Sequence, residues 1–174
     1  MTSRSIALGL LLGLAGMAHA ESRIEVGFSP EGSARELVLQ TIGSARRSIR
    51  MLAYSFQAPD ILQALVDARA RGVEVRIVVD KKRNLGKASR KAMDFVTRHG
   101  VELRTNANFR VHHDKTIIVD GNTVETGSFN FALPSEALNS ENVVVIHGMP
   151  EVSAQYLAHW QSRWDGGRPY KAGS

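Results

Sequence analysis

Apolar and polar positions follow two different spacings along the first two-thirds of the chain. Short segments with alternating or continuous apolar residues predict four strands, at residues 23–28, 48–54, 73–80 and 101–104. Between them, apolar residues recur every three or four positions and predict helices that begin near Ser33, at Pro59 and near Ala88. Strands that alternate with helices are typical of an α/β fold, so we expect a largely parallel β-sheet sandwiched between helices.

The spacing changes after residue 112. Residues 113–120 and 124–127 predict two strands joined by a turn at Asp120-Gly121-Asn122, an antiparallel hairpin that makes the expected sheet mixed. A buried strand at 142–146 and a helix from Pro150 to Trp164 follow, and residues 165–174 are expected to be a polar tail. No repeat or linker interrupts the pattern, so we expect residues 21–174 to form a single domain.

The N-terminus predicts the compartment. Arg4 is the only charge before an apolar run at residues 6–18, and Ala18-His19-Ala20 matches the small-x-small cleavage pattern. The run is too short for a comfortable transmembrane span, so a cleaved signal peptide at residues 1–20 is favoured over an uncleaved anchor. We therefore expect a bacterial periplasmic or secreted protein with no stable membrane insertion after cleavage.

The composition is that of a globular protein, with 43% hydrophobic and 22% charged residues, which argues against disorder. The formal net charge of +5 suits an anionic partner such as nucleic acid or a lipid headgroup, although charge that serves only solubility is the alternative. The chain has no cysteine, which excludes disulfides, thiolate zinc sites and cysteine nucleophiles.

The predicted hairpin carries the candidate chemistry. Residues two apart on a strand share a face, so His113 and Lys115 are expected to point to the same side. The return strand brings Ser128 and Asn130 near the His113 end. An imidazole, an ammonium, a hydroxyl and a carboxamide together can engage a phosphate. Asp120 starts the turn, and we expect it mainly to hold the loop, with direct chemistry as the less favoured role.

These residues form the pattern His-x-Lys-x4-Asp-x6-Gly-Ser-x-Asn, whose chance match is about 10⁻⁸ per start position. The pattern resembles the HKD motif of the phospholipase D superfamily, and the chain matches that motif at His113, Lys115, Asp120, Gly127, Ser128 and Asn130. Ser140-Glu141-Asn142 is similar to the acidic position of the superfamily. The small size, the signal peptide and the single motif resemble the Nuc-type bacterial endonucleases.

The resemblance implies a phospholipase D-like fold and metal-independent phosphodiester hydrolysis. Members of the family combine two motifs: one histidine attacks phosphorus to form a phosphohistidine, and the other protonates the leaving oxygen and then activates water. This chain carries one motif, so a two-fold homodimer would supply the second. Two Lys115 ammoniums would then take the place of Mg²⁺, so no cofactor is expected. By analogy with the family, Glu141 would orient His113.

Four cations after the third strand are further candidates for binding backbone phosphates: Lys81, Lys82, Arg83 and Lys87. A merely solvated loop is the alternative. The pair His112 and His113 also allows a metal-binding interpretation, but adjacent strand residues face opposite ways, so we expect no metal site and a surface or supporting role for His112. His99, His147 and His159 are expected to be caps or surface groups.

The sequence therefore predicts a secreted, largely non-specific endonuclease that acts on DNA, with RNA as a further candidate substrate. A phospholipase acting on lipid headgroups is the second hypothesis, ranked lower because the chain has no evident acyl groove or exposed amphipathic membrane helix. A catalytically inert nucleic-acid-binding protein is the third, and the intact motif argues against it because a pure binder would not need His113.

Overall fold

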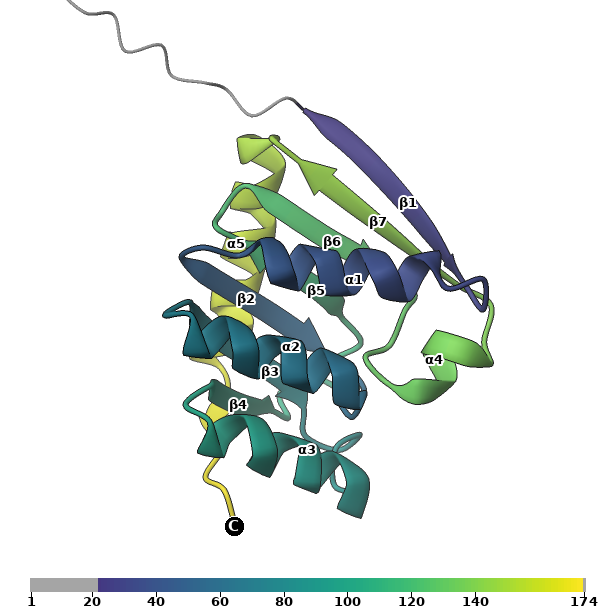
Figure 1. Cartoon of the computed structure of the whole chain (residues 1–174). Helices are drawn as coiled ribbons and strands as arrows, with labels where there is room; N and C mark the ends of the chain where they lie inside the picture. Colours follow the sequence, from purple (N-terminus) through teal and green to yellow (C-terminus); the bar gives the residue numbers. More distant parts are fainter. Residues whose placement is uncertain (1–21, 174) are drawn as a thin grey trace, which may run out of the picture.

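The computed structural model describes residues 22–173, which are organised around one mixed eight-stranded sheet (Figure 1). The expected signal peptide lies outside the described residues. The strands are β1 (Arg23–Ser29), β2 (Ser48–Ala53), β3 (Glu74–Asp80), β4 (Glu102–Asn106), β5 (Lys115–Val119), β6 (Thr123–Gly127), β7 (Glu141–His147) and β8 (Arg168–Pro169). The helices are α1 (Ser33–Ser44), α2 (Pro59–Ala70), α3 (Lys87–Arg98), α4 (Leu133–Ala137) and α5 (Pro150–Asp165).

The mixed α/β fold is confirmed, but the parallel part of the sheet is smaller than expected. The strand order is β1-β7-β6-β5-β2-β3-β4-β8, and only the pairs β2–β3 and β3–β4 are parallel. The hairpin β5–β6 and strand β7 insert between β1 and β2, so that β1 pairs with β7 rather than with the next strand in the chain. Strands β1 to β4 do run in one direction, but these insertions make most neighbouring pairs antiparallel.

Helices cover the two faces of the sheet unequally. Helices α1, α2 and α3 lie on one face over the larger apolar core, and α5 crosses the other (Figure 1). The smaller core under α5 joins sheet residues such as Ile118 and Val124 to Trp160 and Trp164, whose rings stack 5.2 Å apart. Both tryptophans are buried. Because both faces of β2 and β5 are covered, these two strands form a rigid base for the loops at their ends.

One acidic residue lies inside the larger core. The side chain of Glu125 on β6 is fully buried, and neither carboxyl oxygen has a hydrogen-bond partner among the described residues. Burial raises the pKa of Glu125 well above its usual value. Burial therefore favours the neutral form of this carboxyl, and the unpaired polar group weakens the core more than an apolar residue would.

Local details differ from the sequence expectation at both ends of the chain. The residue before α1 is Gly32 rather than Ser33, and the Ser33 hydroxyl accepts a hydrogen bond from the Phe28 amide at 2.9 Å. The expected polar tail is wrong in part. Strand β8 pairs with the edge of β4, and the Tyr170 hydroxyl donates to Asp94 at 2.7 Å. A two-residue strand is too short to produce a recognisable pattern of alternation.

The ends of several strands meet at one edge of the sheet. Strands β2 and β3 end there, and β5 begins there, since Lys115 pairs with Ala53. In open α/β sheets, ligands bind beyond the carboxyl ends of parallel strands. Of the helices within residues 22–173, none has both the length and the apolar character needed to cross a membrane.

Candidate active site

The segment that carries His113 lies just before β5 rather than within it, since the strand begins at Lys115. Two neighbouring strand ends hold this segment. The His112 amide donates to Asp80 Oδ2 at 2.9 Å, and the Tyr54 amide donates to the Asp114 carbonyl at 2.9 Å. The side chain of His113 is exposed while the backbone on either side of it is fixed. An accessible imidazole on a fixed backbone suits a nucleophile or a general base.

Tyr54 brings the imidazole and the ammonium of the motif together. Its ring meets the His113 ring edge-on, with the centroids 4.6 Å apart, and lies 5.2 Å from Lys115 Nζ. Lys115 Nζ also donates to the His113 carbonyl at 2.8 Å. The two side chains therefore share one side, as their spacing predicted. Sequence analysis missed Tyr54, although its position directly after the buried strand β2 was a usable signal.

Lys115 is a cation with little exposure to water. Its side chain is buried, and burial lowers the pKa of its ammonium, while the charges of Glu141 and Asp114 act in the opposite direction. A poorly hydrated ammonium attracts an anion more strongly than one in bulk water, because the local dielectric constant is low. Lys115 can therefore stabilise negative charge beside His113.

The residues at the end of β6 form a second part of the site. Glu141 at the start of β7 accepts hydrogen bonds from Ser128 Oγ at 2.5 Å and from Asn139 Nδ2 at 2.9 Å. Burial alone would raise the pKa of Glu141, but these hydrogen bonds outweigh it and lower the pKa below its usual value. Glu141 is thus ionised at neutral pH. Within residues 22–173 it is bonded to Ser128, and no hydrogen bond joins it to His113.

The glycine of the motif is required by the approach of β7. A side-chain carbon at Gly127 would lie 2.2 Å from the Asn142 carbonyl oxygen, a distance that no substituent can occupy. The same approach lets the Ser128 amide donate to that oxygen at 3.1 Å. Gly127 therefore permits the backbone contact that fixes Ser128 beside Glu141.

Ser135 on α4 connects two of the predicted site residues and was missed by sequence analysis. It is fully buried, its hydroxyl donates to Glu141 Oε1 at 3.2 Å, and it accepts from the Asn130 amide at 3.2 Å. Asn130 Oδ1 is buried with no hydrogen-bond partner among the described residues, so this part of the site holds an unsatisfied acceptor. The only sequence signal for Ser135 was its place between Asn130 and Glu141.

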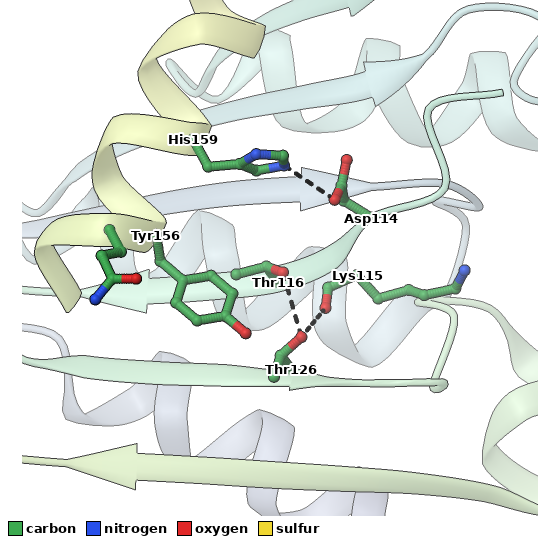
Figure 2. A pocket seen from close by; sticks show the side chains of 7 residues that line it. Asp114, Lys115, Thr116, Thr126, Tyr156 and His159 are labelled. Atoms are coloured by element: carbon green, nitrogen blue, oxygen red, sulfur yellow. Dashed lines mark hydrogen bonds and ion pairs between the residues drawn. The ribbon is translucent and has the colours of Figure 1, made fainter. Parts of the chain in front are cut away.

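Asp114 lies between two histidines of different exposure. Its carboxylate oxygens are 3.0 Å from His112 Nε2 and 3.1 Å from His159 Nε2, and Figure 2 shows the contact with His159. Burial would raise the pKa of Asp114, but the two imidazoles lower it to about 2. His112 is buried, so of its two expected roles the supporting one is correct. His159 is a partly exposed surface group, as expected, and α5 also places its ring against Asp114, a contact that the sequence did not indicate.

Asp120 lies at the opposite end of β5 from Lys115, about 17 Å away for a strand of five residues. Its carboxylate accepts hydrogen bonds from the amides of Arg46, Arg47 and Ser48 at 3.0, 2.8 and 2.8 Å. Burial opposes ionisation, but these three bonds hold the pKa of Asp120 below its usual value. The structure separates Asp120 from the other candidates and gives it the loop-holding role, so its inclusion among residues of the chemistry is corrected.

The basic loop after β3 lies beside His113. Its residues Lys81, Lys82 and Arg83 are exposed, as is Lys87, the first residue of α3. The Arg83 guanidinium lies 5.7 Å from the centre of the Tyr54 ring, on which His113 also rests. Asn84 fixes the loop by donating to the Tyr54 carbonyl at 2.8 Å. The candidate site is thus bordered by exposed positive charges on a loop whose backbone is anchored.

Side chains that ligate metals do not gather in the part of the chain that the structure describes. Among residues 22–173, no group of three or more histidine, cysteine, aspartate or glutamate side chains is arranged to hold an ion. His112 is buried against Asp114 and His113 is exposed against Tyr54, so the adjacent histidines do not converge.

Comparisons with known proteins identify the family. A family model described as "Cardiolipin synthase, PLD-like domain" matches residues 38–164. The phospholipase D of Rickettsia bellii is 35% identical over 144 residues, which cover 83% of this chain and 70% of the relative. The chain belongs to the phospholipase D superfamily. It is accordingly a phosphodiesterase of that superfamily.

Solved structures of this superfamily agree with the fold. Nuc from Salmonella typhimurium, a phospholipase D family member, is 57% identical with a TM-score of 0.86, covering 87% of this chain and 99% of that chain. NucT from Helicobacter pylori is 19% identical with a TM-score of 0.79, covering 86% of this chain and 100% of that chain, which shows the fold alone. Within the phospholipase D superfamily, the chain is of the Nuc type.

Proposed function

We propose that this protein is a secreted, metal-independent endonuclease of low sequence specificity that hydrolyses DNA, and RNA as a second substrate, at a site shared by two copies of the chain. The observation that carries the proposal is the group around Tyr54. An exposed His113, a buried Lys115 and the exposed Arg83 contact one aromatic ring at the edge of the sheet. This group offers a nucleophile and positive charge to a phosphodiester without a metal ion.

The reaction proceeds in two displacements. In the first, His113 in its neutral form attacks phosphorus, the bond from phosphorus to the leaving oxygen breaks, and that oxygen takes a proton from the partner subunit's His113. In the second, the partner's imidazole accepts a proton from water, and the resulting hydroxide attacks the phosphohistidine. The bond from phosphorus to His113 then breaks, and His113 is free again.

The surrounding residues stabilise the charge that develops on phosphorus. The Lys115 ammonium of each copy neutralises the phosphoryl oxygens in a site of low dielectric constant. The ionised Glu141 stays bonded to Ser128 and keeps the end of β6 in place. We propose that Glu141 forms a direct hydrogen bond with His113 once two copies have assembled and the substrate is bound. The exposed loop cations bind phosphates on either side of the scissile bond.

An uncovered apolar strip supports a homodimer. On β1, Ile24, Val26 and Phe28 are 58%, 58% and 52% exposed, and their register places them beside Val144 and Ile146 of β7. Helix α5 lies farther along the same face and leaves this strip open (Figure 1). The strip ends next to Glu141, which pairs with Ser29. A second copy seated there would cover the strip and bring a second His113 toward the first.

Phosphatidyl headgroups are the second candidate substrate, because the Rickettsia relatives carry the name phospholipase D. Two observations favour nucleic acid. The relative with the higher identity, at 57%, is the Salmonella Nuc. The three exposed cations of the loop after β3, together with Lys87 at the start of α3, also suit a polyanion with repeated phosphates better than a single headgroup.

The decisive experiment incubates the protein without residues 1–20 with plasmid DNA, with RNA and with phospholipid vesicles, each with and without EDTA. Nicking of DNA that persists in EDTA is the expected result, and His113→Ala should abolish it while DNA binding remains. Loss of nicking in EDTA would contradict the metal-free mechanism. Headgroup release without nicking would establish the phospholipase, and DNA binding without any cleavage would establish an inert binder.

The shared site is tested by the oligomeric state. Light scattering should give twice the mass of one chain. Val26→Glu, which places a charge in the apolar strip, should give monomers without nuclease activity. Leu85→Glu adds the same charge at an equally exposed apolar side chain outside the strip and should remain dimeric. An active monomer would overturn the shared site. Export is tested separately, by locating the full-length chain and a chain without residues 1–20 in bacterial cell fractions.

A further inference from the structure

A cavity of about 380 Å³ lies between α5 and the hairpin β5–β6, next to the segment that carries His113 (Figure 2). The hairpin contributes Lys115, Thr116 and Thr126 to its wall, and α5 contributes Gln155, Tyr156 and His159. Asp114, the residue directly after His113, also lines the cavity. Only one residue, Asp114, separates His113 from the residues of the hairpin wall.

The wall of the cavity combines the phenol ring of Tyr156 with hydrogen-bond donors and acceptors. Tyr156 packs against the smaller core and also lines the cavity. The Thr116 and Thr126 hydroxyls lie 3.5 Å apart, and Thr126 Oγ1 donates to the Lys115 carbonyl at 3.2 Å. His159 is held by Asp114. A ligand that fits this wall has a flat face and both donors and acceptors on its edge.

These properties favour a nucleobase over the other parts of the candidate substrates. The Lys115 side chain extends away from Tyr156 in Figure 2, and its ammonium donates to the His113 carbonyl, so no lysine charge faces the cavity. The Asp114 carboxylate in the wall of the cavity repels a phosphate. An acyl chain could form no hydrogen bond with the polar groups of this wall, whereas a heterocycle can. A flat heterocycle can stack on tyrosine and bond to the polar groups at once.

We propose that this cavity binds the base of a nucleotide that adjoins the scissile phosphodiester, with Tyr156 as the stacking surface and Gln155 as a hydrogen-bonding partner of its edge. The inference rests on the proposed nuclease function and adds a subsite to it. The subsite accepts all bases, since every base has a face to stack and the threonine and glutamine groups can both donate and accept. It thereby supplies affinity for nucleic acid without strong sequence preference.

The test compares small chromogenic esters that differ only in the group next to the phosphate. Thymidine 3′-(4-nitrophenyl phosphate) and thymidine 5′-(4-nitrophenyl phosphate) carry a base, and methyl 4-nitrophenyl phosphate carries none. The measured quantity is the ratio of kcat/KM for each nucleoside ester to kcat/KM for the methyl ester. In Tyr156→Ala, this ratio should fall about five- to a hundredfold for one of the two nucleoside esters, because base stacking is lost.

Two further variants distinguish stacking from a general effect on α5. Tyr156→Phe keeps the ring and should keep the ratio. Gln161→Ala changes an exposed glutamine of the same helix outside the cavity and should also keep it. Thermal unfolding and light scattering of Tyr156→Ala show whether it is folded and dimeric, and the ratio, measured per folded molecule, remains a valid readout if some protein unfolds.

The outcomes separate this inference from the function beneath it. If the wild-type protein cleaves the esters but Tyr156→Ala keeps the wild-type ratio for both nucleoside esters, the subsite does not exist while the nuclease proposal stands. If Tyr156→Ala becomes monomeric, the cavity is part of the interface between copies and the inference is wrong. If the wild-type protein cleaves no phosphodiester of any kind, the proposed function fails and the subsite fails with it.

Discussion

Asp120 belongs to the sequence motif but lies at the far end of β5 from His113. We therefore predict that substitution of Asp120 lowers the free energy of unfolding and leaves kcat nearly unchanged. In Asp120→Ala, the amides of Arg46, Arg47 and Ser48 lose their shared acceptor. Arg46 and Arg47 are exposed and regain hydrogen bonds from water, while the Ser48 amide is partly buried. One bond to a charged group contributes about 1.5–3 kcal/mol, and we expect a loss near the upper end.

The backbone adds to this cost. Asp120 has φ 53, a left-handed conformation that alanine adopts less readily by about 1–2 kcal/mol. The free energy of unfolding of Asp120→Ala should therefore fall by about 3–5 kcal/mol, which lowers Tm by about 8–15 °C for a chain of this length. Asp120→Asn tolerates the left-handed conformation and keeps one acceptor oxygen, so its loss should be about 1–2 kcal/mol.

The assay is thermal unfolding followed by circular dichroism, together with kcat measured well below both midpoints. The kcat per folded molecule of Asp120→Asn should stay within about threefold of wild type, since only an interaction made in the transition state would change it by more. A fall of a hundredfold in a folded Asp120→Asn would refute the assignment of Asp120 to loop holding.

The same residue predicts how stability depends on pH. The pKa of Asp120 is lowered in the folded state from an ordinary value of 3.8, so its stabilising contribution is present above about pH 4. The contribution is lost as the pH falls through the folded pKa, because the unfolded chain binds the proton more readily. In Asp120→Asn, this part of the acid destabilisation should be absent, and urea unfolding at pH 7 and at pH 3 measures the difference.

Three further predictions concern other parts of the molecule. Ser135→Ala removes the hydroxyl that joins Asn130 to Glu141 and should lower kcat about tenfold and Tm by about 2–8 °C, because the Asn130 amide loses its acceptor; steady-state kinetics and thermal unfolding measure the two effects. The pKa of Glu125 is raised in the folded state, so its pH-dependent cost to the free energy of unfolding is absent below pH 4.5 and grows as the pH rises toward the folded pKa. Glu125→Gln does not ionise. Its Tm, measured by thermal unfolding, should therefore be higher than that of wild type at pH 8 and little different at pH 4. Replacing Lys82 and Arg83 by alanine should weaken DNA binding and reduce the slope of log Kd against log salt by about one for each phosphate that the loop no longer neutralises, and an unchanged slope would remove the loop from the interface.

Much of the fold was predictable because its signals are local. Apolar spacing places strands and helices from Ser48 to Arg98 almost as they occur, and Pro59 begins α2 as expected. The hairpin was equally accessible, since alternation and a turn at Asp120 lie within a few residues of each other. The same local spacing predicted that His113 and Lys115 share a side, and the Tyr54 ring that both side chains approach agrees with it.

The pairing of distant segments was not predictable in the same way. Nothing in the spacing of β1 indicates that β5, β6 and β7 separate it from β2, because the choice of neighbour depends on the packing of both faces of the sheet. For the same reason the expected parallel character was too high. The pairing of β8 with β4 involves two residues and leaves no periodic signal.

The sequence by itself determined the family of this protein, because the motif residues lie at fixed spacing on a hairpin whose geometry is set by the local backbone. Only the tertiary structure decided which motif residues work together. It placed Lys115 beside His113 and Ser128 beside Glu141, and it moved Asp120 to the far end of the strand. It also brought Tyr54, Ser135 and His159 to the site. Their contacts depend on how separate segments pack together, which the periodicity of the sequence does not indicate.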